Sequence, residues 1–172
     1  MSAPEEGAAA GPAATGDRAE LRALAEGYAS AVDGRDGQGL AERFVEDGTL
    51  IVPRYPDELE PTVSRWGHDR LRAIPDGLAR YHVTFHEVTG ASYRIAGDRA
   101  EGQVGCVAHH VTAAPADAGP GVPAGTDLVW FIRYLDSYVR TADGWRFETR
   151  ALHLLWTEEH PVAVLGPPAV AG

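Results

Sequence analysis

The second half of the chain contains four long strand-like stretches in close succession, and this succession limits the fold more than any other feature. Residues 81–95 and 100–112 have alternating, β-branched character and are separated by a Gly-Asp turn. Residues 127–140 and 145–156 repeat the pattern across an Ala-Asp-Gly turn. Strands joined by such short turns pair antiparallel. The sequence therefore predicts a meander of long antiparallel strands.

The first half of the chain is expected to be mainly helical. From Asp17, which is placed to cap a helix, apolar residues recur at three- and four-residue steps as far as Val32. A second, shorter helix is predicted over residues 37–44 and a third over residues 67–79. Three helices and a curved antiparallel sheet wrapped around them form an α+β fold that encloses a cavity.

Two further segments lie between these helices. Residues 49–52 read as a short strand after an Asp-Gly turn, and residues 53–64 as a loop rich in proline and acidic residues. The segment 113–125 consists of Pro, Gly and Ala with few large apolar residues, so it is expected to be a loop.

Length and composition indicate one globular domain. The chain has 172 residues, of which residues 17–157 are expected to form the domain, residues 1–16 a disordered leader and residues 158–172 a tail. A single cysteine, Cys106, excludes an intrachain disulfide and a cysteine zinc cluster, so a cytoplasmic location is the default. The net charge of −10 argues against nucleic-acid binding, and no apolar run is long enough to span a membrane.

Asp33 and two histidines are the first candidates for chemistry. Asp33 stands near the C-terminal end of the first helix, where the helix dipole disfavours a negative charge, so it either belongs to a surface turn or is held by another group. His82, Thr84 and His86 would share one face of a strand. Four strand residues span about 13 Å. The two imidazoles therefore cannot share one metal ion, and no metal site is expected.

Later strands supply further polar candidates. His109 and His110 are consecutive on a strand, so only one of them can face a pocket, and the sequence leaves open which. Arg150 lies among apolar neighbours, so it is expected to meet a carboxylate or to bind a substrate anion or oxyanion. The carboxylates weighed as its partner are those of Asp136, Glu148 and Asp33.

Tyrosine and tryptophan side chains complete the set of predicted substrate contacts, although most aromatic residues of such a chain fill its core. The hydroxyl groups of Tyr28 and Tyr55 are candidates for a pocket, together with the rings of Trp66, Trp130 and Tyr134.

Several segments together resemble the SnoaL-like branch of the nuclear transport factor 2-like superfamily. They are Y-A-S-A-V-D-G-R-D at 28–36, L-A-E-R-F-V-E-D-G-T-L at 40–50, H-V-T-F-H at 82–86, G-D-R-A at 97–100 and Y-L-D-S-Y-V-R-T-A-D-G-W-R-F-E-T-R at 134–150. The resemblance covers roughly residues 17–157 and implies a cone-shaped α+β barrel, in which a curved mixed or antiparallel sheet encloses a pocket.

Within this branch the chain looks most similar to scytalone dehydratases and hexachlorocyclohexane dehydrochlorinases, which use an Asp–His pair. The resemblance assigns the aspartate to Asp33 and the catalytic histidine to His82. It places His86 where relatives often have asparagine, and His110, or His109 after a one-residue slip, at a second histidine position. It also matches Arg150 to an assisting arginine, and Tyr28 to the place of a lysine in the dehydrochlorinases.

The resemblance and the residues together predict a cofactor-independent lyase or isomerase, a dehydratase or cyclase, that acts on a hydrophobic, carbonyl-containing small molecule in bacterial secondary metabolism such as antibiotic biosynthesis. His82 would remove a proton while Asp33 orients its ring. Two alternatives remain open: epoxide opening or hydrolysis with Asp33 activating water, and a non-catalytic small-molecule-binding dimer. A homodimer through the outer face of the sheet is expected in either case.

Overall fold

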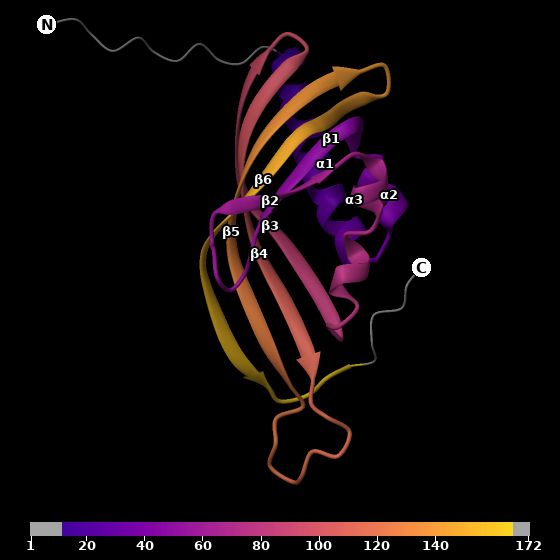
Figure 1. Ribbon diagram of the computed structural model, residues 1–172. Coiled ribbons are helices and arrows are strands. Elements are labelled where there is room, and N and C mark those ends of the chain that lie inside the picture. The colour runs from indigo at the N-terminus through magenta and orange to yellow at the C-terminus, as the bar shows by residue number, and fades with distance from the viewer. Residues whose placement is uncertain (1–11, 167–172) are drawn as a thin grey trace, which may run out of the picture.

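The computed structural model describes residues 12–166 and consists of a curved six-stranded sheet with its helices on one side (Figure 1). The elements in chain order are α1 (Pro12–Asp33), α2 (Gly37–Ala41), β1 (Phe44–Pro53), β2 (Pro61–Trp66), α3 (His68–Arg72), the 3₁₀ helix η1 (Pro75–Leu78), β3 (Val83–Ala96), β4 (Arg99–Ala113), β5 (Gly125–Thr141) and β6 (Gly144–Val162). The predicted α+β class is confirmed. None of the described helices is long and apolar enough to cross a membrane.

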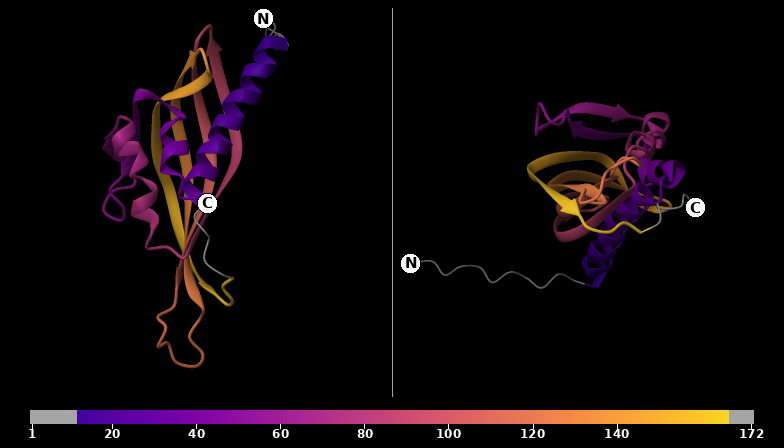
Figure 2. Two further views of the ribbon diagram at one scale, coloured as in Figure 1. Left: turned by 90° about the vertical axis from the view of Figure 1, so that its right-hand side faces the viewer. Right: turned by 90° about the horizontal axis from the view of Figure 1, so that it is seen from below.

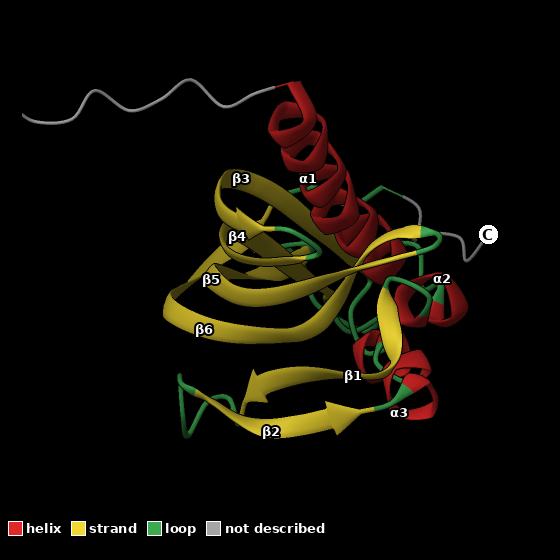
Figure 3. Ribbon diagram, turned by 90° about the horizontal axis from the view of Figure 1, so that it is seen from above, coloured by secondary structure: helices red, strands yellow, loops and turns green. Residues whose placement is uncertain are grey.

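The sheet is mixed and does not close. Its strand order is β2-β1-β6-β5-β4-β3, in which β1 and β6 are parallel and all other neighbours are antiparallel. Seen from above, the long strands β3 to β6 curve around one side of the molecule, and β1, which pairs with β6, carries β2 at its outer edge (Figure 3). Because β2 and β3 are the two edges, the sheet forms a cup and not a complete barrel.

Turn residues explain why the long strands follow one another directly. The β3–β4 turn contains Gly97 at φ 60°, and the β5–β6 turn contains Gly144 at φ 98°. Positive φ values of this kind suit glycine in tight hairpin turns. By contrast, β4 and β5 are joined by the predicted loop of residues 114–124, which extends beyond the lower end of the sheet (Figure 1).

Helix α1 supplies one wall of the core. Leu21, Ala25, Tyr28 and Val32 recur along one face of the helix and are each at most 4% exposed. Figure 2 shows α1 lying obliquely beside the long strands, with α2 and α3 grouped on its other side. The C-terminal end of α1 is thereby brought next to β3, which is where Asp33 meets the sheet.

The N-terminal elements differ from the predicted ones in their limits. Helix α1 begins at Pro12, and Asp17 lies inside it, where its carboxylate accepts hydrogen bonds from Arg140 and Trp145 and does not cap the helix. Of the predicted leader, residues 1–11 lie outside the described residues. Helix α2 is capped by Asp36, whose carboxylate accepts from the amide of Gly39 at 2.8 Å, and it ends at Ala41.

Three other predictions of secondary structure require correction. Strand β1 runs from Phe44 to Pro53 through the expected Asp-Gly turn, and the supposed loop 53–64 contains the start of β2. The third helix is split into α3 and η1, because Pro75 lacks an amide hydrogen and starts a new turn. Strand β6 continues to Val162, beyond the domain limit predicted at residue 157.

Candidate active site

Asp33 and His86 form a hydrogen-bonded pair at the junction of α1 and β3. The Nδ1 atom of His86 lies 2.7 Å from Oδ1 of Asp33, and the backbone amide of His86 donates to Oδ2 at 2.7 Å. The side chains are 7% exposed for His86 and 23% for Asp33. Because β3 is an edge strand, an amide that points away from β4 has no neighbouring strand to donate to. The amide of His86 donates to the carboxylate of Asp33 instead. Two hydrogen bonds therefore fix the position of this histidine.

Hydrogen bonding also determines the charge of Asp33 and the orientation of the His86 ring. Burial raises the pKa of Asp33, but hydrogen bonds and charge interactions with His86, and a hydrogen bond from Thr84, outweigh this and lower it below 3.8. The carboxylate is therefore ionised at neutral pH and accepts the Nδ1 hydrogen. Nε2 is the ring nitrogen directed away from Asp33, and it has no hydrogen-bond partner among the described residues. A histidine whose Nε2 is unprotonated can remove a proton from a ligand.

Thr84 and Arg35 form a chain of hydrogen bonds that ends at the carboxylate of Asp33. The guanidinium of Arg35 donates to the hydroxyl of Thr84 at 2.7 Å and to the carbonyl of Val32 at 3.1 Å. Arg35 takes a positive φ of 58° in the turn after α1, which is uncommon for a residue other than glycine. The predicted problem of a negative charge at a helix C-terminus is thus resolved by His86, Thr84 and Arg35.

His82, the predicted catalytic histidine, is not paired with Asp33. It precedes the first residue of β3, and its Nε2 lies 3.0 Å from the carbonyl of Gly166. It lines a pocket of about 560 Å³ whose other residues include Arg35, Arg80 and Tyr81. The end of α1 meets the strand four residues further along, so His86 occupies the place expected for His82. The shared face predicted for residues 84 and 86 is confirmed, since Thr84 is 3% exposed and both side chains contact Asp33.

His110 and not His109 faces the interior. Its side chain is buried against the rings of Tyr81, His86 and Trp130, at centroid distances of 5.0, 5.6 and 4.9 Å. Burial and the neighbouring His86 lower the pKa of His110 to about 4, so the ring is neutral at pH 7. Its Nδ1 donates to the carbonyl of Leu128 at 3.2 Å. His109 lies on the other face of the sheet, 2.6 Å from Asp127.

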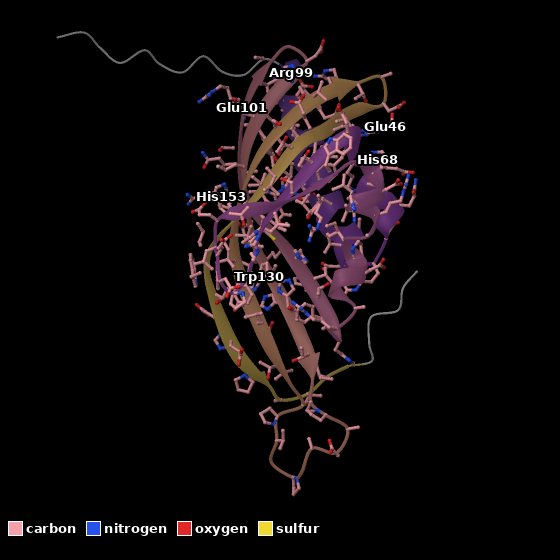
Figure 4. The ribbon with its side chains drawn as sticks, viewed as in Figure 1. Glu46, His68, Arg99, Glu101, Trp130 and His153 are labelled. Carbon is pink, nitrogen blue, oxygen red and sulfur yellow. The ribbon has the colours of Figure 1, made fainter. Side chains whose placement is uncertain are left out.

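Aromatic rings extend this group of side chains away from Asp33. Trp130 lies on the lower half of the sheet (Figure 4), and its ring contacts His110 and also Tyr55, 5.0 Å away. Tyr81 also packs against His110, and its hydroxyl accepts a hydrogen bond from Arg80 at 2.8 Å. The candidate site thus joins the hydrogen-bonded Asp33–His86 pair to the neutral imidazole of His110 and three aromatic rings.

Arg150 forms a buried ion pair in the core, not a contact in this site. Its guanidinium donates to both oxygens of Asp136 at 3.0 Å, and the hydroxyl of Tyr138 donates to the same carboxylate at 2.7 Å. Asp136 is therefore the partner among the three carboxylates considered. Burial disfavours the cation, but the facing carboxylate outweighs this and raises the pKa of Arg150. The predicted catalytic role of Arg150 is not supported, because its hydrogen bonds are directed to Asp136.

Tyr28 and Tyr134 belong to the same core cluster. The guanidinium of Arg150 lies 4.5 Å from the ring centroid of Tyr28 and 3.9 Å from that of Tyr134. Both rings are at most 4% exposed, and burial raises the pKa of Tyr28 to about 12, so its hydroxyl stays protonated. The structure places these two predicted substrate contacts in the packing around a buried cation.

Trp66, a further predicted substrate contact, lies elsewhere on the molecule. It is 66% exposed at the end of the edge strand β2 and lines a pocket of about 1230 Å³ with residues that include Glu46 and His68. Figure 4 shows Glu46 and His68 on the helical side of the molecule, away from Trp130. Trp66 is therefore separate from the Asp33–His86 pair, because an edge strand leaves its outward side chains in solvent, and its contact with a substrate stays a prediction.

Sequence reasoning missed Arg35, Thr84 and Tyr81 as parts of this site. Thr84 could have been inferred, because it alternates with His86 on the face that meets α1. Arg35 lies in a turn, and its sequence position carries no periodic signal. Tyr81 falls at the start of the stretch predicted as a strand, but in the structure it precedes β3. Among the residues described, no three His, Cys, Asp or Glu side chains are grouped closely enough to hold a metal ion.

Comparison with solved structures supports the same fold. The Kfla4162 protein from Kribbella flavida is 27% identical, with a TM-score of 0.70, over 84% of this chain and 95% of that one. A candidate scytalone dehydratase from Novosphingobium aromaticivorans DSM 12444 is 18% identical, with a TM-score of 0.67, over 89% of this chain and 93% of that one. Hexachlorocyclohexane dehydrochlorinase LinA-type3 from Novosphingobium barchaimii LL02 is 16% identical, with a TM-score of 0.67, over 90% and 97%.

Sequence comparison gives the family directly. No curated protein matches the chain at a significant level. The family profile described as "SnoaL-like domain", however, matches residues 13–151, which include every element from α1 to β5 and the first part of β6. This chain belongs to the SnoaL-like domain family.

Proposed function

We propose that this chain is a cofactor-independent lyase or isomerase, a dehydratase or cyclase, that removes a proton from a hydrophobic, carbonyl-containing small molecule. His86 is the general base, and Asp33 is a positioning residue. The observation that supports this proposal is the double attachment of His86 to one carboxylate, through its ring and through its own backbone amide, at 2.7 Å each. This geometry leaves Nε2 as the ring nitrogen that is directed away from the carboxylate.

Proton abstraction by His86 follows from ordinary acid–base chemistry. When Nε2 takes a proton, the ring becomes an imidazolium, and the ionised Asp33 stabilises that charge at Nδ1. Positioned general bases of this kind contribute about 10²–10⁴-fold to rates. The same first step begins a dehydration, a ring-closing aldol reaction and a double-bond isomerisation, since each passes through an enolate or its equivalent.

His110 has a different role in this proposal. Its pKa of about 4 keeps it neutral, and the Nδ1 hydrogen bond to Leu128 leaves Nε2 as a hydrogen-bond acceptor. His110 therefore accepts a hydrogen bond from a hydroxyl group of the substrate and does not supply a positive charge. Its ring contacts Tyr81 and Trp130, and Tyr55 packs on Trp130. Aromatic rings of this kind suit a flat, hydrophobic substrate.

The proposal is tested by proton exchange on a simple ketone. The probe is 2-tetralone in deuterated buffer, whose α-proton signals are followed by NMR. The sequence contains no lysine, so side-chain amines cannot catalyse the exchange through Schiff bases. The wild-type protein is expected to accelerate exchange, and His86→Gln and Asp33→Asn to lower that acceleration about 100-fold or more.

His82→Gln is the matched control, since it changes a histidine of the same segment that has no contact with Asp33. It is expected to keep the wild-type rate. Equal rates for wild type and His86→Gln, or loss of exchange in His82→Gln alone, would refute the assignment of the base.

Epoxide opening with Asp33 activating water is less well supported. Both oxygens of Asp33 already accept hydrogen bonds from His86, so the carboxylate is occupied in holding the histidine. Once a substrate is known, reaction in heavy-oxygen water separates the two chemistries, because hydrolysis places solvent oxygen in the product and elimination does not.

A role in secondary metabolism or antibiotic biosynthesis, and a cytoplasmic location, stay predictions from the sequence.

We also propose that the protein forms a homodimer through the outer face of its sheet. Phe85 is 58% exposed there, and Trp156, 48% exposed, stacks on Phe131 with ring centroids 4.2 Å apart. Exposed aromatic side chains of this size are typical of protein interfaces. Light scattering at several concentrations tests the proposal, and a monomer at all of them contradicts it.

A further inference from the structure

A pocket of about 560 Å³ lies between the 3₁₀ helix η1 and the residues that lead into β3. Two guanidinium groups line it, those of Arg35 and Arg80, and one carboxylate, that of Asp76. The chain as a whole carries a net charge of −10, so an excess of positive charge in one pocket runs against its overall balance. A concave site of one sign attracts ligands of the opposite sign.

Two larger pockets do not share this excess. In the pocket of about 1230 Å³ at Trp66, Arg72 pairs with Asp69 at 2.8 Å. In a pocket of about 800 Å³, Arg94 pairs with Glu101 at 3.1 Å. By contrast, neither arginine of the 560 Å³ pocket forms an ion pair with a carboxylate in residues 12–166. Their counter-ion is therefore open to a ligand.

Arg80 and Tyr81 form a preorganised pair of donors at this pocket. Nη2 of Arg80 donates to the hydroxyl of Tyr81 at 2.8 Å, and its guanidinium carbon lies 4.8 Å from the centroid of the same ring. Tyr81 is only 9% exposed, and its own hydroxyl hydrogen has no acceptor in the described part of the chain. A guanidinium and a hydroxyl that already touch can both donate to one oxyanion, with little further loss of side-chain freedom.

Arg35 supplies a second, fixed positive charge. Its Nη1 donates to the carbonyl of Val32 and the hydroxyl of Thr84, and its Nη2 donates to the carbonyl of Leu78 at 3.3 Å. A guanidinium has five N–H groups, so two of them remain after these three bonds. His82 also lines the pocket, and its Nε2 is taken up by the carbonyl of Gly166 at 3.0 Å.

Charge and lining together define one kind of ligand. Two arginines and one carboxylate leave an excess of one positive charge beside the neutral form of His82, and a monoanion balances it. Pro75 and Ala79 add apolar surface for an uncharged portion of the ligand. We propose that this pocket binds the carboxylate group of a small organic acid.

In this complex the carboxylate oxygens accept hydrogen bonds from Arg80 and from the hydroxyl of Tyr81, while the charge of Arg35 attracts the anion. The Asp33–His86 pair does not line the pocket. The inference therefore goes beyond the proposed function and does not depend on it.

The test is an NMR titration of the ¹⁵N-labelled protein with benzoate at constant ionic strength. Benzoate is expected to move the Nε–H signal of Arg80 and the backbone amide signal of Tyr81, whereas benzamide, which has the same shape without the charge, is not. Inorganic phosphate is expected to compete at least 10-fold less well than benzoate, because it has no apolar portion to bury. Equal shifts with benzamide, or equal competition by phosphate, overturn the inference.

Matched variants locate the bound anion. Arg80→Gln is expected to weaken benzoate binding about 10-fold or more, and Tyr81→Phe to weaken it several-fold. Arg65→Gln makes the same change in net charge on the exposed surface of β2, outside the pocket, and is expected to bind as the wild type does. Wild-type affinity in Arg80→Gln, or an equal loss in Arg65→Gln, overturns the site. The amide spectrum of each variant shows whether it is folded.

The titration also separates this inference from the proposed function. His86→Gln is expected to bind benzoate with wild-type affinity. If benzoate binding depends on Arg80 but proton exchange does not depend on His86, the carboxylate site stands and the proposed reaction fails. If exchange depends on His86 but benzoate moves neither the Arg80 nor the Tyr81 signal, the reaction stands and the inference fails.

Discussion

Replacing Asp136 by asparagine is expected to destabilise the fold strongly, because it leaves the cation of Arg150 buried without its counter-ion. The two side chains are at most 1% exposed, and both carboxylate oxygens accept hydrogen bonds from the guanidinium at 3.0 Å. Breaking a buried pair by removing one partner costs about 3–5 kcal/mol in the free energy of unfolding. For a protein of this size that corresponds to a fall in Tm of about 6–20 °C.

A surface pair of similar geometry provides the control for this experiment. Arg99 donates to the two oxygens of Glu148 at 3.1 and 2.9 Å, but these side chains are 67% and 41% exposed. Removing an exposed pair changes stability by about 0.2–1 kcal/mol. Urea unfolding followed by circular dichroism should therefore separate Asp136→Asn from Glu148→Gln clearly. If both variants unfold at the same urea concentration as the wild type, burial does not govern the strength of this pair.

Three further predictions concern stability and assembly. The pKa of His110 is about 4 in the folded protein and about 6.5 in the unfolded chain. Between these pH values the unfolded chain therefore binds more protons than the folded protein. The free energy of unfolding is expected to fall by about 3 kcal/mol from pH 7 to pH 4 for this reason. Urea titrations should show this loss in His109→Gln but much less of it in His110→Gln, and equal pH profiles would contradict it. Gly125→Ala would place a methyl group 2.1 Å from a backbone oxygen and should lower the free energy of unfolding by about 1–3 kcal/mol. In Gly119→Ala the added methyl group meets nothing within 4 Å, so stability should not change. Thermal melts of the two variants test this difference. If the homodimer uses the outer face of the sheet, Trp156→Glu should yield a monomer in light scattering with an unchanged circular dichroism spectrum.

The long strands were predictable because their signals are local. Alternation and Gly-containing turns identified β3 to β6 to within a few residues, except that β6 continues to Val162. The edge strand β2 was missed because its sequence, with a proline at its start and charged neighbours, resembles a loop. The single helix predicted over residues 67–79 is two separate turns in the structure, because Pro75 interrupts it.

The candidate site was predicted only in part, since its residues come together through tertiary structure. Asp33 was identified, and the shared face of Thr84 and His86 was correct, but the partner of Asp33 was taken to be His82. Periodicity tells which residues share a face, and it does not tell at which residue of the strand the helix end makes contact. The choice between His109 and His110 likewise depended on which face of β4 points inward.

Asp33 accepts hydrogen bonds from both the backbone amide and the ring of His86. Exchange of that amide hydrogen therefore reports on the position of the carboxylate. Any motion that withdraws the carboxylate must also free one main-chain hydrogen of the edge strand, which then becomes open to solvent deuterium. The hydrogen-exchange rate of the His86 amide thus measures how often the His86 ring loses its contact with Asp33, and the measurement needs no substrate.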